Sequence, residues 1–141
     1  MNALAQRLPL YAAALWWGSL TVIGFIAVPL LFANLPAPAM AGYVAARIFT
    51  AQSWVSVACC VVLLAASKPK FESNSTQAPA TPSQAAIVFI VLGLLLALLL
   101  EYAVAPRIVM RQNLRLWHGL GTVMYFVQWL CAAAALWSRE R

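Results

Sequence analysis

Long apolar stretches, separated by short polar segments, make up most of the chain. Residues 8–46 contain no charged side chain, and the only break in this stretch is Asn34-Leu35-Pro36-Ala37-Pro38. A helix needs about 20 apolar residues to cross a bilayer. The pattern therefore predicts a first membrane-spanning helix over about residues 8–32, a proline-rich turn, and the start of a second helix.

The same pattern predicts three further helices. The second runs over about residues 41–66 and the third over about 84–105, where Pro106 is expected to stop it because proline lacks a backbone N–H. The fourth covers about 116–137. Residues 67–83 are polar and rich in Pro, Ser and Thr, which predicts a mobile loop.

Four such helices predict an all-α integral membrane protein, an up-down bundle of four transmembrane helices forming a single domain over residues 1–141. Trp117 and Trp137 bracket the fourth helix, and their separation corresponds to about 30 Å of helix, the thickness of a hydrocarbon core.

Composition agrees with this fold. Of the 141 residues 65% are hydrophobic and 9% are charged, whereas about a quarter of a soluble domain is charged. The net charge of +6 is scattered between apolar runs rather than gathered in a patch, which argues against nucleic-acid binding. The expected partner is the lipid bilayer.

Four spans place both termini on one side. That side carries five cations, Arg7, Lys68, Lys70, Arg139 and Arg141, and the other carries four, Arg47, Arg107, Arg111 and Arg115. Cationic segments favour the cytoplasm, so we expect cytoplasmic termini.

An internal similarity links the first and third helices. Each ends in an Ala-Val run that meets a proline, Pro29 or Pro106, and continues to an Asn-Leu. The similarity predicts two hairpin repeats of the same direction; chance similarity of apolar sequence is the alternative.

Arg47, Glu101 and His118 fall within the predicted helices at a similar depth. Ionisable side chains inside a membrane are costly unless they snorkel, pair or line a hydrated cavity. One interpretation is an Arg47–Glu101 ion pair, with His118 among the lipid headgroups. The other is a binding or conducting mouth completed by Tyr43 and Arg107. A metal or haem site is a third, although a single histidine cannot hold a metal alone.

Cys59, Cys60 and Cys131 lie at similar depth in the other half, with Met124 two turns from Cys131. Such soft ligands suit Cu(I), but buried packing is the ordinary role of cysteine. We expect no cofactor. No catalytic pattern is visible, so we expect no enzymatic activity.

Several short motifs resemble a family of small four-helix membrane proteins. They are Leu15-Trp16-Trp17-Gly18, Gly24-Phe25, Pro29, Phe32, Ala46-Arg47-Ile48-Phe49, Ala105-Pro106 and Leu116-Trp117-His118. The family resembled is bacterial, of unknown function, and related to the animal transmembrane protein 205 family. The resemblance implies a compact bundle in the bacterial cytoplasmic (inner) membrane, and it brings no reaction, substrate or cofactor.

The expected function is therefore a non-enzymatic membrane protein that binds or moves a small solute or ion. The alternatives are a small accessory subunit of a larger membrane complex and a haem- or metal-binding redox protein. Small residues such as Gly18, Gly24, Gly119 and Gly121 suit close helix packing, and a homo-oligomer is the rival interpretation of them.

Overall fold

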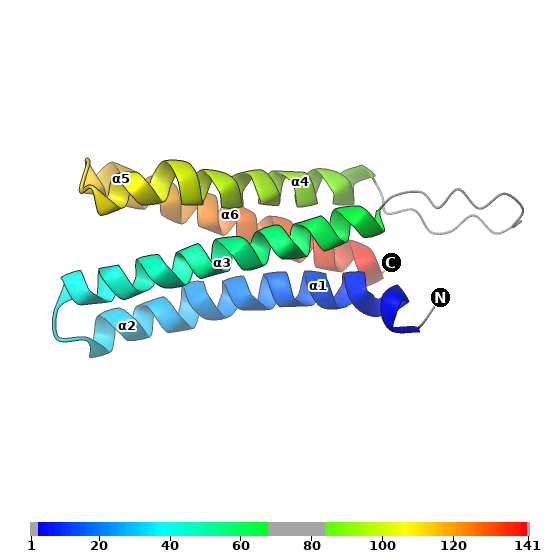
Figure 1. The fold of residues 1–141 in the computed structure, drawn as a ribbon, viewed down its shortest axis with the longest axis horizontal. Helices are drawn as coiled ribbons and strands as arrows, with labels where there is room; N and C mark the ends of the chain where they lie inside the picture. Colours follow the sequence, from blue (N-terminus) through cyan, green and yellow to red (C-terminus); the bar gives the residue numbers. More distant parts are fainter. Residues whose placement is uncertain (1–2, 68–83, 141) are drawn as a thin grey trace, which may run out of the picture.

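Four long helical rods lie side by side in the computed structural model, which describes residues 3–67 and 84–140 (Figure 1). Each rod is long and apolar enough to cross a membrane, and the described residues contain no strand. The prediction of an all-helical chain with four such helices is therefore confirmed. The expected loop, apart from Ser67, lies outside the described residues.

Two of the rods are interrupted by a π-helical segment. The first rod comprises α1 (Ala3–Val22), the π segment η1 (Ile23–Ala27) and α2 (Val28–Asn34). The third comprises α4 (Gln84–Leu99), the π segment η2 (Leu100–Val104) and α5 (Ala105–Val109). The second rod is α3 (Pro38–Ala66) and the fourth is α6 (Leu114–Glu140).

The rods form a ring in which each packs on two neighbours. Both α1 and α4 pack against α3 and α6, so α1 and α4 are diagonal partners. The described ends of the chain lie at one end of the bundle, and two short turns close the other end (Figure 1). We call these the terminal end and the turn end.

Pro106 does not stop the third helix, contrary to our expectation. The helix continues to Val109, because η2 rearranges the backbone just before the proline and Pro106 then occupies the first turn of α5. A proline is tolerated there, since the first N–H groups of a helix have no intrahelical partner. Pro29 stands in the same relation to η1 and α2.

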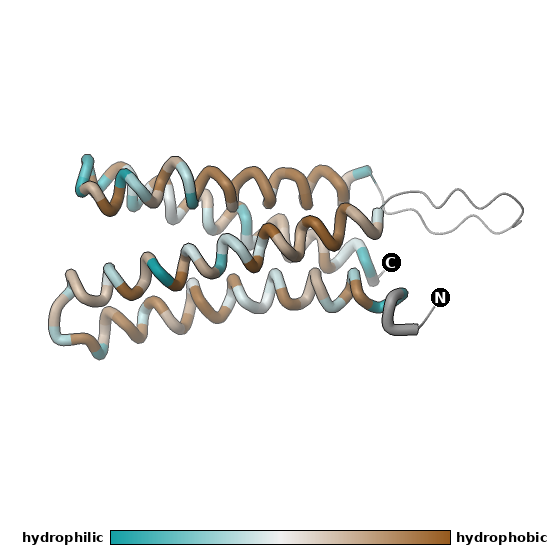
Figure 2. Tube along the Cα trace, in the orientation of Figure 1, coloured by the Kyte–Doolittle hydropathy of each residue, from teal (hydrophilic) through white to brown (hydrophobic). Residues whose placement is uncertain are grey.

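A tightly packed core fills the terminal half. Trp16, Leu20, Cys60, Leu63 and Ile90 are among its fully buried members. The remaining members of this core are small: Ala12, Ala13, Cys59, Cys131, Ala132 and Ala135. Figure 2 shows α4, which covers one side of this half, as the most continuously hydrophobic rod.

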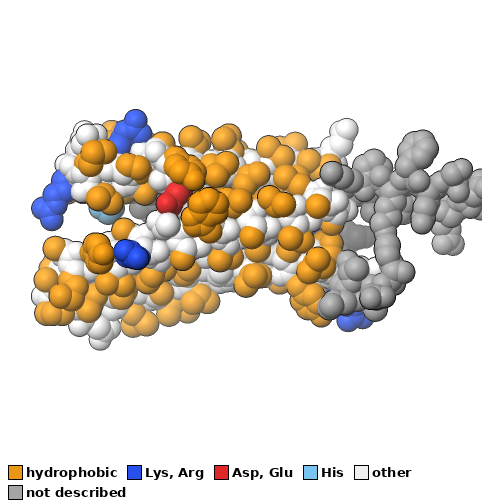
Figure 3. Space-filling model, in the orientation of Figure 1, with side chains coloured by type: hydrophobic (Ala, Val, Ile, Leu, Met, Phe, Trp, Pro, Cys, Tyr) orange, Lys and Arg blue, Asp and Glu red, His pale blue; other side chains and the backbone are white. Residues whose placement is uncertain are grey.

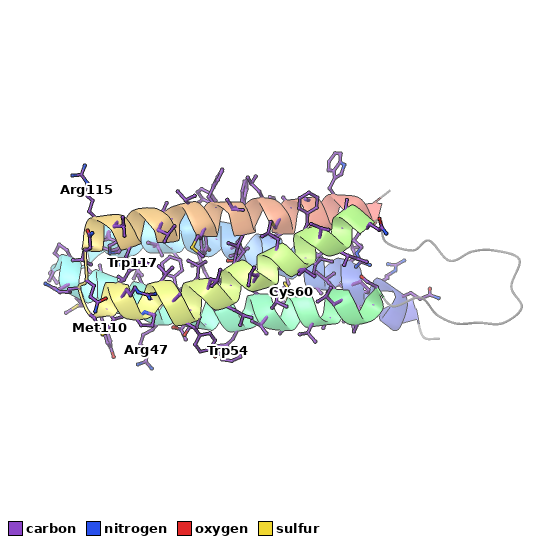
Figure 4. The ribbon with its side chains drawn as sticks, turned by 90° about the horizontal axis from the view of Figure 1, so that it is seen from above. Arg47, Trp54, Cys60, Met110, Arg115 and Trp117 are labelled. Carbon is purple, nitrogen blue, oxygen red and sulfur yellow. The ribbon has the colours of Figure 1, made fainter. Side chains whose placement is uncertain are left out.

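The three cysteines belong to this core. All three are buried free thiols, and the described residues contain no group of three His, Cys, Asp or Glu side chains placed to hold a metal ion. In Figure 4, Cys60 lies within the bundle.

The turn half is packed differently. Among the other rods, the main neighbour of α2 is α3 and that of α5 is α6, so the rods remain paired near the turns while the four-sided ring of the terminal half is lost. Figure 3 shows the bundle hollowed at this end, between these two pairs.

Candidate functional site

A cavity of about 350 Å³ occupies the turn half of the bundle. All four rods contribute to its wall, and most lining side chains are apolar, among them Val28, Phe32, Phe49, Val104 and Ile108. Pockets for small molecules begin at about 300 Å³ and are mostly apolar with a few polar groups. The cavity therefore has the size and character of a small-ligand site.

Two glutamines form a polar floor. Gln52 lies 14 residues after the start of α3 and Gln128 lies 14 residues after the start of α6. At a rise of about 1.5 Å per residue, both lie about 21 Å from the turn end. Both line the cavity, and their exposed fractions are only 3% and 2%.

Hydrogen bonds fix the orientation of Gln52. Its Nε2 donates to the Oγ of Ser19 at 3.0 Å and to the Oγ of Ser56 at 3.3 Å. The Ser19 hydroxyl itself donates to the carbonyl of Trp16, so it is the acceptor toward Gln52.

Two polar side-chain atoms at this floor have no hydrogen-bond partner among the described residues. They are Oε1 of Gln52, an acceptor, and Nε2 of Gln128, a donor, and both are buried. An unsatisfied buried polar atom costs about 1–3 kcal/mol. Neither atom has surface open to the cavity, so both lie behind its lining.

Tyr125 closes the side of the cavity toward α1. Its hydroxyl donates to the carbonyl of Leu20 at 2.8 Å, and its ring meets Phe49 edge-on with centroids 5.4 Å apart. A Cβ at Gly24 in η1 would lie 2.7 Å from this ring, so the position requires glycine for η1 and α6 to approach this closely.

Glu101 and His118 stand in the upper wall. Glu101 belongs to η2, eight residues before the end of α5, about 12 Å from the turn end. Its side chain is half-buried, and the structure gives it no hydrogen bond or ion pair with another described residue. His118 is exposed, four residues into α6, about 6 Å from that end.

Arg47 and Tyr43 do not join them. The Arg47 guanidinium donates to the Tyr43 hydroxyl at 3.4 Å, and both side chains are exposed. Figure 4 shows Arg47 and Trp54 pointing away from the bundle. The face shared by Tyr43, Arg47, Thr50 and Trp54 is therefore the outer face of α3, and the described residues contain no ion pair between Arg47 and Glu101.

Arg107 is also absent from the cavity wall. Its guanidinium donates to the carbonyl of Ala103 at 2.6 Å and lies 4.5 Å from the ring centroid of Trp117. Trp117 points inward in Figure 4. Arg107 is thus held across the α5–α6 turn by a cation–π contact.

The expected mouth is therefore divided. Glu101 and His118 line one cavity, Arg47 and Tyr43 face outward, and Arg107 braces the turn. Sequence reasoning missed Gln52, Gln128 and Tyr125. A glutamine inside an otherwise apolar stretch was the available signal, because a buried amide requires partners.

The chain belongs to the family described as a domain of unknown function (DUF4149), whose model matches residues 11–116. The match covers α2, α3, α4, α5, most of α1 and the first residues of α6. The expected membership in a family of unknown function is confirmed to that extent. No curated protein and no solved structure matches the chain.

Proposed function

We propose that this member of the DUF4149 family is a multi-pass membrane protein that binds a small amphiphilic solute in the cavity of its turn half. The observation that carries the proposal is the cavity itself, a space of about 350 Å³ with mostly apolar walls and a few polar side chains, Gln52, Gln128 and Glu101 among them. An apolar body with a polar end matches that lining.

Binding fits the geometry better than conduction. Below Gln52 and Gln128 the bundle is filled by Trp16, Leu20 and Leu63, each with no exposed surface. Protein interiors packed in this way leave no continuous path for water or ions. The cavity is therefore blind in this conformation.

Several features support a membrane setting. Large apolar side chains cover the outside of the rods, as at Leu15, Phe25, Leu95 and Val123. A soluble protein rarely exposes so much contiguous apolar surface. We place the protein in the bacterial cytoplasmic membrane with both termini inside, so the cavity opens to the opposite side. A relation to the animal transmembrane protein 205 family is part of the same proposal.

The paired π segments support the two-hairpin repeat. In each hairpin a five-residue π segment ends two residues before the proline, at Ala27 before Pro29 and at Val104 before Pro106. Pseudo-symmetric repeats commonly place a binding site at their interface, as the cavity is placed here.

Photolabelling with a neutral alcohol tests the binding proposal. The purified full chain, in lipid nanodiscs, is titrated with octanol carrying a diazirine and irradiated, and labelled residues are mapped by mass spectrometry. We expect saturable labelling at lining residues such as Val104 and Thr122. Labelling at Val123, which is 62% exposed on the outside, should rise linearly with partitioned probe.

A filled cavity supplies the matched control. Gly42 lines the cavity and a Cβ there meets nothing within 4 Å, so Gly42→Phe adds a ring without a backbone clash. Gly119 has the same open space but lies outside the lining. Gly42→Phe should abolish saturable labelling and Gly119→Phe should preserve it. Equal labelling in the two variants would refute the binding site.

A further inference from the structure

We infer that the cavity selects an organic cation, an ammonium group on an apolar body, and that Glu101 is its counter-charge. The inference rests on the proposed binding function and specifies the class of solute.

The charge of the lining points to a cation. Among the described residues that line the cavity, Glu101 is the one carboxylate, and none is lysine or arginine. The nearest candidates are engaged elsewhere, because Arg47 contacts Tyr43 on the outer face and Arg107 lies over Trp117. In the proposed membrane a carboxylate is costly unless it is paired or hydrated, so a cationic solute would stabilise Glu101.

An inorganic cation fits this lining poorly. Hard cations take six or more oxygen ligands at close range, and the described residues offer no group of three metal-binding side chains. In a space of about 350 Å³ walled largely by side chains such as Val28, Phe32 and Ile108, such an ion would have too few ligands. A large cation with its own apolar surface fills the space instead.

Aromatic rings add a second attraction. Phe32, Phe49 and Tyr125 all line the cavity, and a cation near an aromatic face is attracted to the ring, most strongly when water is excluded.

Glu101 and Gln52 lie at different distances from the turn end and mark the two polar ends of the site. Glu101 lies about 12 Å and Gln52 about 21 Å from the turn end, so about 9 Å of mainly apolar wall separates them along the bundle axis. A solute held by its ammonium at Glu101 has that length available for its apolar body.

The test compares three photoreactive probes that differ in charge: diazirine-bearing octylamine, octanol and octanoate. Saturable labelling of the cavity is measured on the full chain in nanodiscs and normalised to labelling at the outward-facing Val123. The wild-type chain should reach half-saturation with octylamine at a concentration at least tenfold below that for octanol, and octanoate should be the weakest.

Substitutions at Glu101 then test whether its carboxylate causes the preference for the cationic probe. Glu101→Gln keeps the shape and removes the charge, so half-saturation by octylamine should shift at least tenfold upward while that by octanol stays unchanged. Glu101→Asp should retain the preference for the cation. Arg111→Gln, which changes an exposed charge at the same end of the bundle, should leave all three probes unaffected.

The outcomes separate the two proposals. A cation preference that survives Glu101→Gln, or octanoate labelling as strong as octylamine labelling, overturns the inference alone. Absence of saturable labelling by any probe, with no effect of Gly42→Phe, overturns the binding function with it.

Discussion

Gly93 allows the helices of the terminal half to pack closely. A Cβ at this position would collide with the indole of Trp16, which has no exposed surface and lies at the centre of the core. The missing side chain of α4 thus makes room for the largest side chain of α1.

We expect Gly93→Ala to lower the free energy of unfolding by about 1–3 kcal/mol, the usual cost of overpacking. Gly119→Ala is the control, because a Cβ there meets nothing within 4 Å and alanine favours the helix. Thermal unfolding in detergent measures both. Gly93→Ala should cost less in a Trp16→Leu background, which lacks the indole, than in the wild-type chain; equal stability of the two alanine variants would contradict the packing described.

Arg47 leads to a second prediction at the residue scale. In the proposed membrane its exposed guanidinium reaches the headgroup layer along the surface of α3, as long cationic side chains do. Arg47→Ala should therefore cost less than about 1 kcal/mol, and its effect should add to that of Glu101→Gln. A double-mutant thermal cycle checks this. Coupling above about 1 kcal/mol would mean that the two side chains pair.

The depth of these residues could be predicted from the sequence, whereas the direction they face could not. A fixed rise per residue places Arg47 and Glu101 at similar depth without any knowledge of neighbours. The direction in which a side chain points does not follow from the sequence in this way. Lipid and protein core both accept apolar side chains, so a helix that is apolar all round has no evident inner face. The outward turn of Arg47 and the inward turn of Gln52 follow from packing between rods.

At the scale of elements, the length of the apolar stretches was sufficient to predict four helices. It was insufficient for their ends at the turns. Pro106 predicted a stop, but the π segment η2 lets the helix pass the proline and reach Val109. No residue pattern in Leu100–Val104 predicts the change from α-helical to π-helical hydrogen bonding. We attribute this change to Pro106 and to the packing of η2 against α3 and α6.

The π segments predict that deleting one residue from η2 is tolerated better than deleting one from a regular α-helix. Removing one residue from a regular α-helix rotates everything beyond it by about 100°, whereas removing one from a π segment can restore α geometry with the flanks in place. Deleting Ala103 within η2 should therefore lower the melting temperature much less than deleting Leu95 within α4. Thermal-shift assays compare the two, and similar losses would contradict this account of η2.

The whole molecule combines a closed half with an open half, and a polar layer at Gln52 and Gln128 divides them. The closed half holds the rods together, which allows the other half to splay without unfolding. The result is a cavity confined to the open half.

Orientation in the membrane is the prediction at this scale. Cytoplasmic termini place Asn74, within the polar segment 68–83, on the inside, and place the mouth of the cavity outside. In a background with the three cysteines changed to alanine, Asn74→Cys should resist an impermeant thiol reagent in intact cells and react after lysis. Reaction in intact cells would invert the topology and leave the cavity facing the cytoplasm.

Thiol accessibility at two neighbouring residues tests the central claim most directly. Thr122 lines the cavity about 12 Å from the turn end, and the adjacent Val123 faces outward with 62% of its surface exposed. In the same cysteine-free background, reconstituted in nanodiscs, each residue is changed to cysteine and treated with a charged methanethiosulfonate. A hydrated cavity inside a membrane-embedded bundle predicts fast reaction at Thr122→Cys and almost none at Val123→Cys, which lipid covers. Equal reaction at both would contradict the membrane setting, and no reaction at either would contradict the cavity.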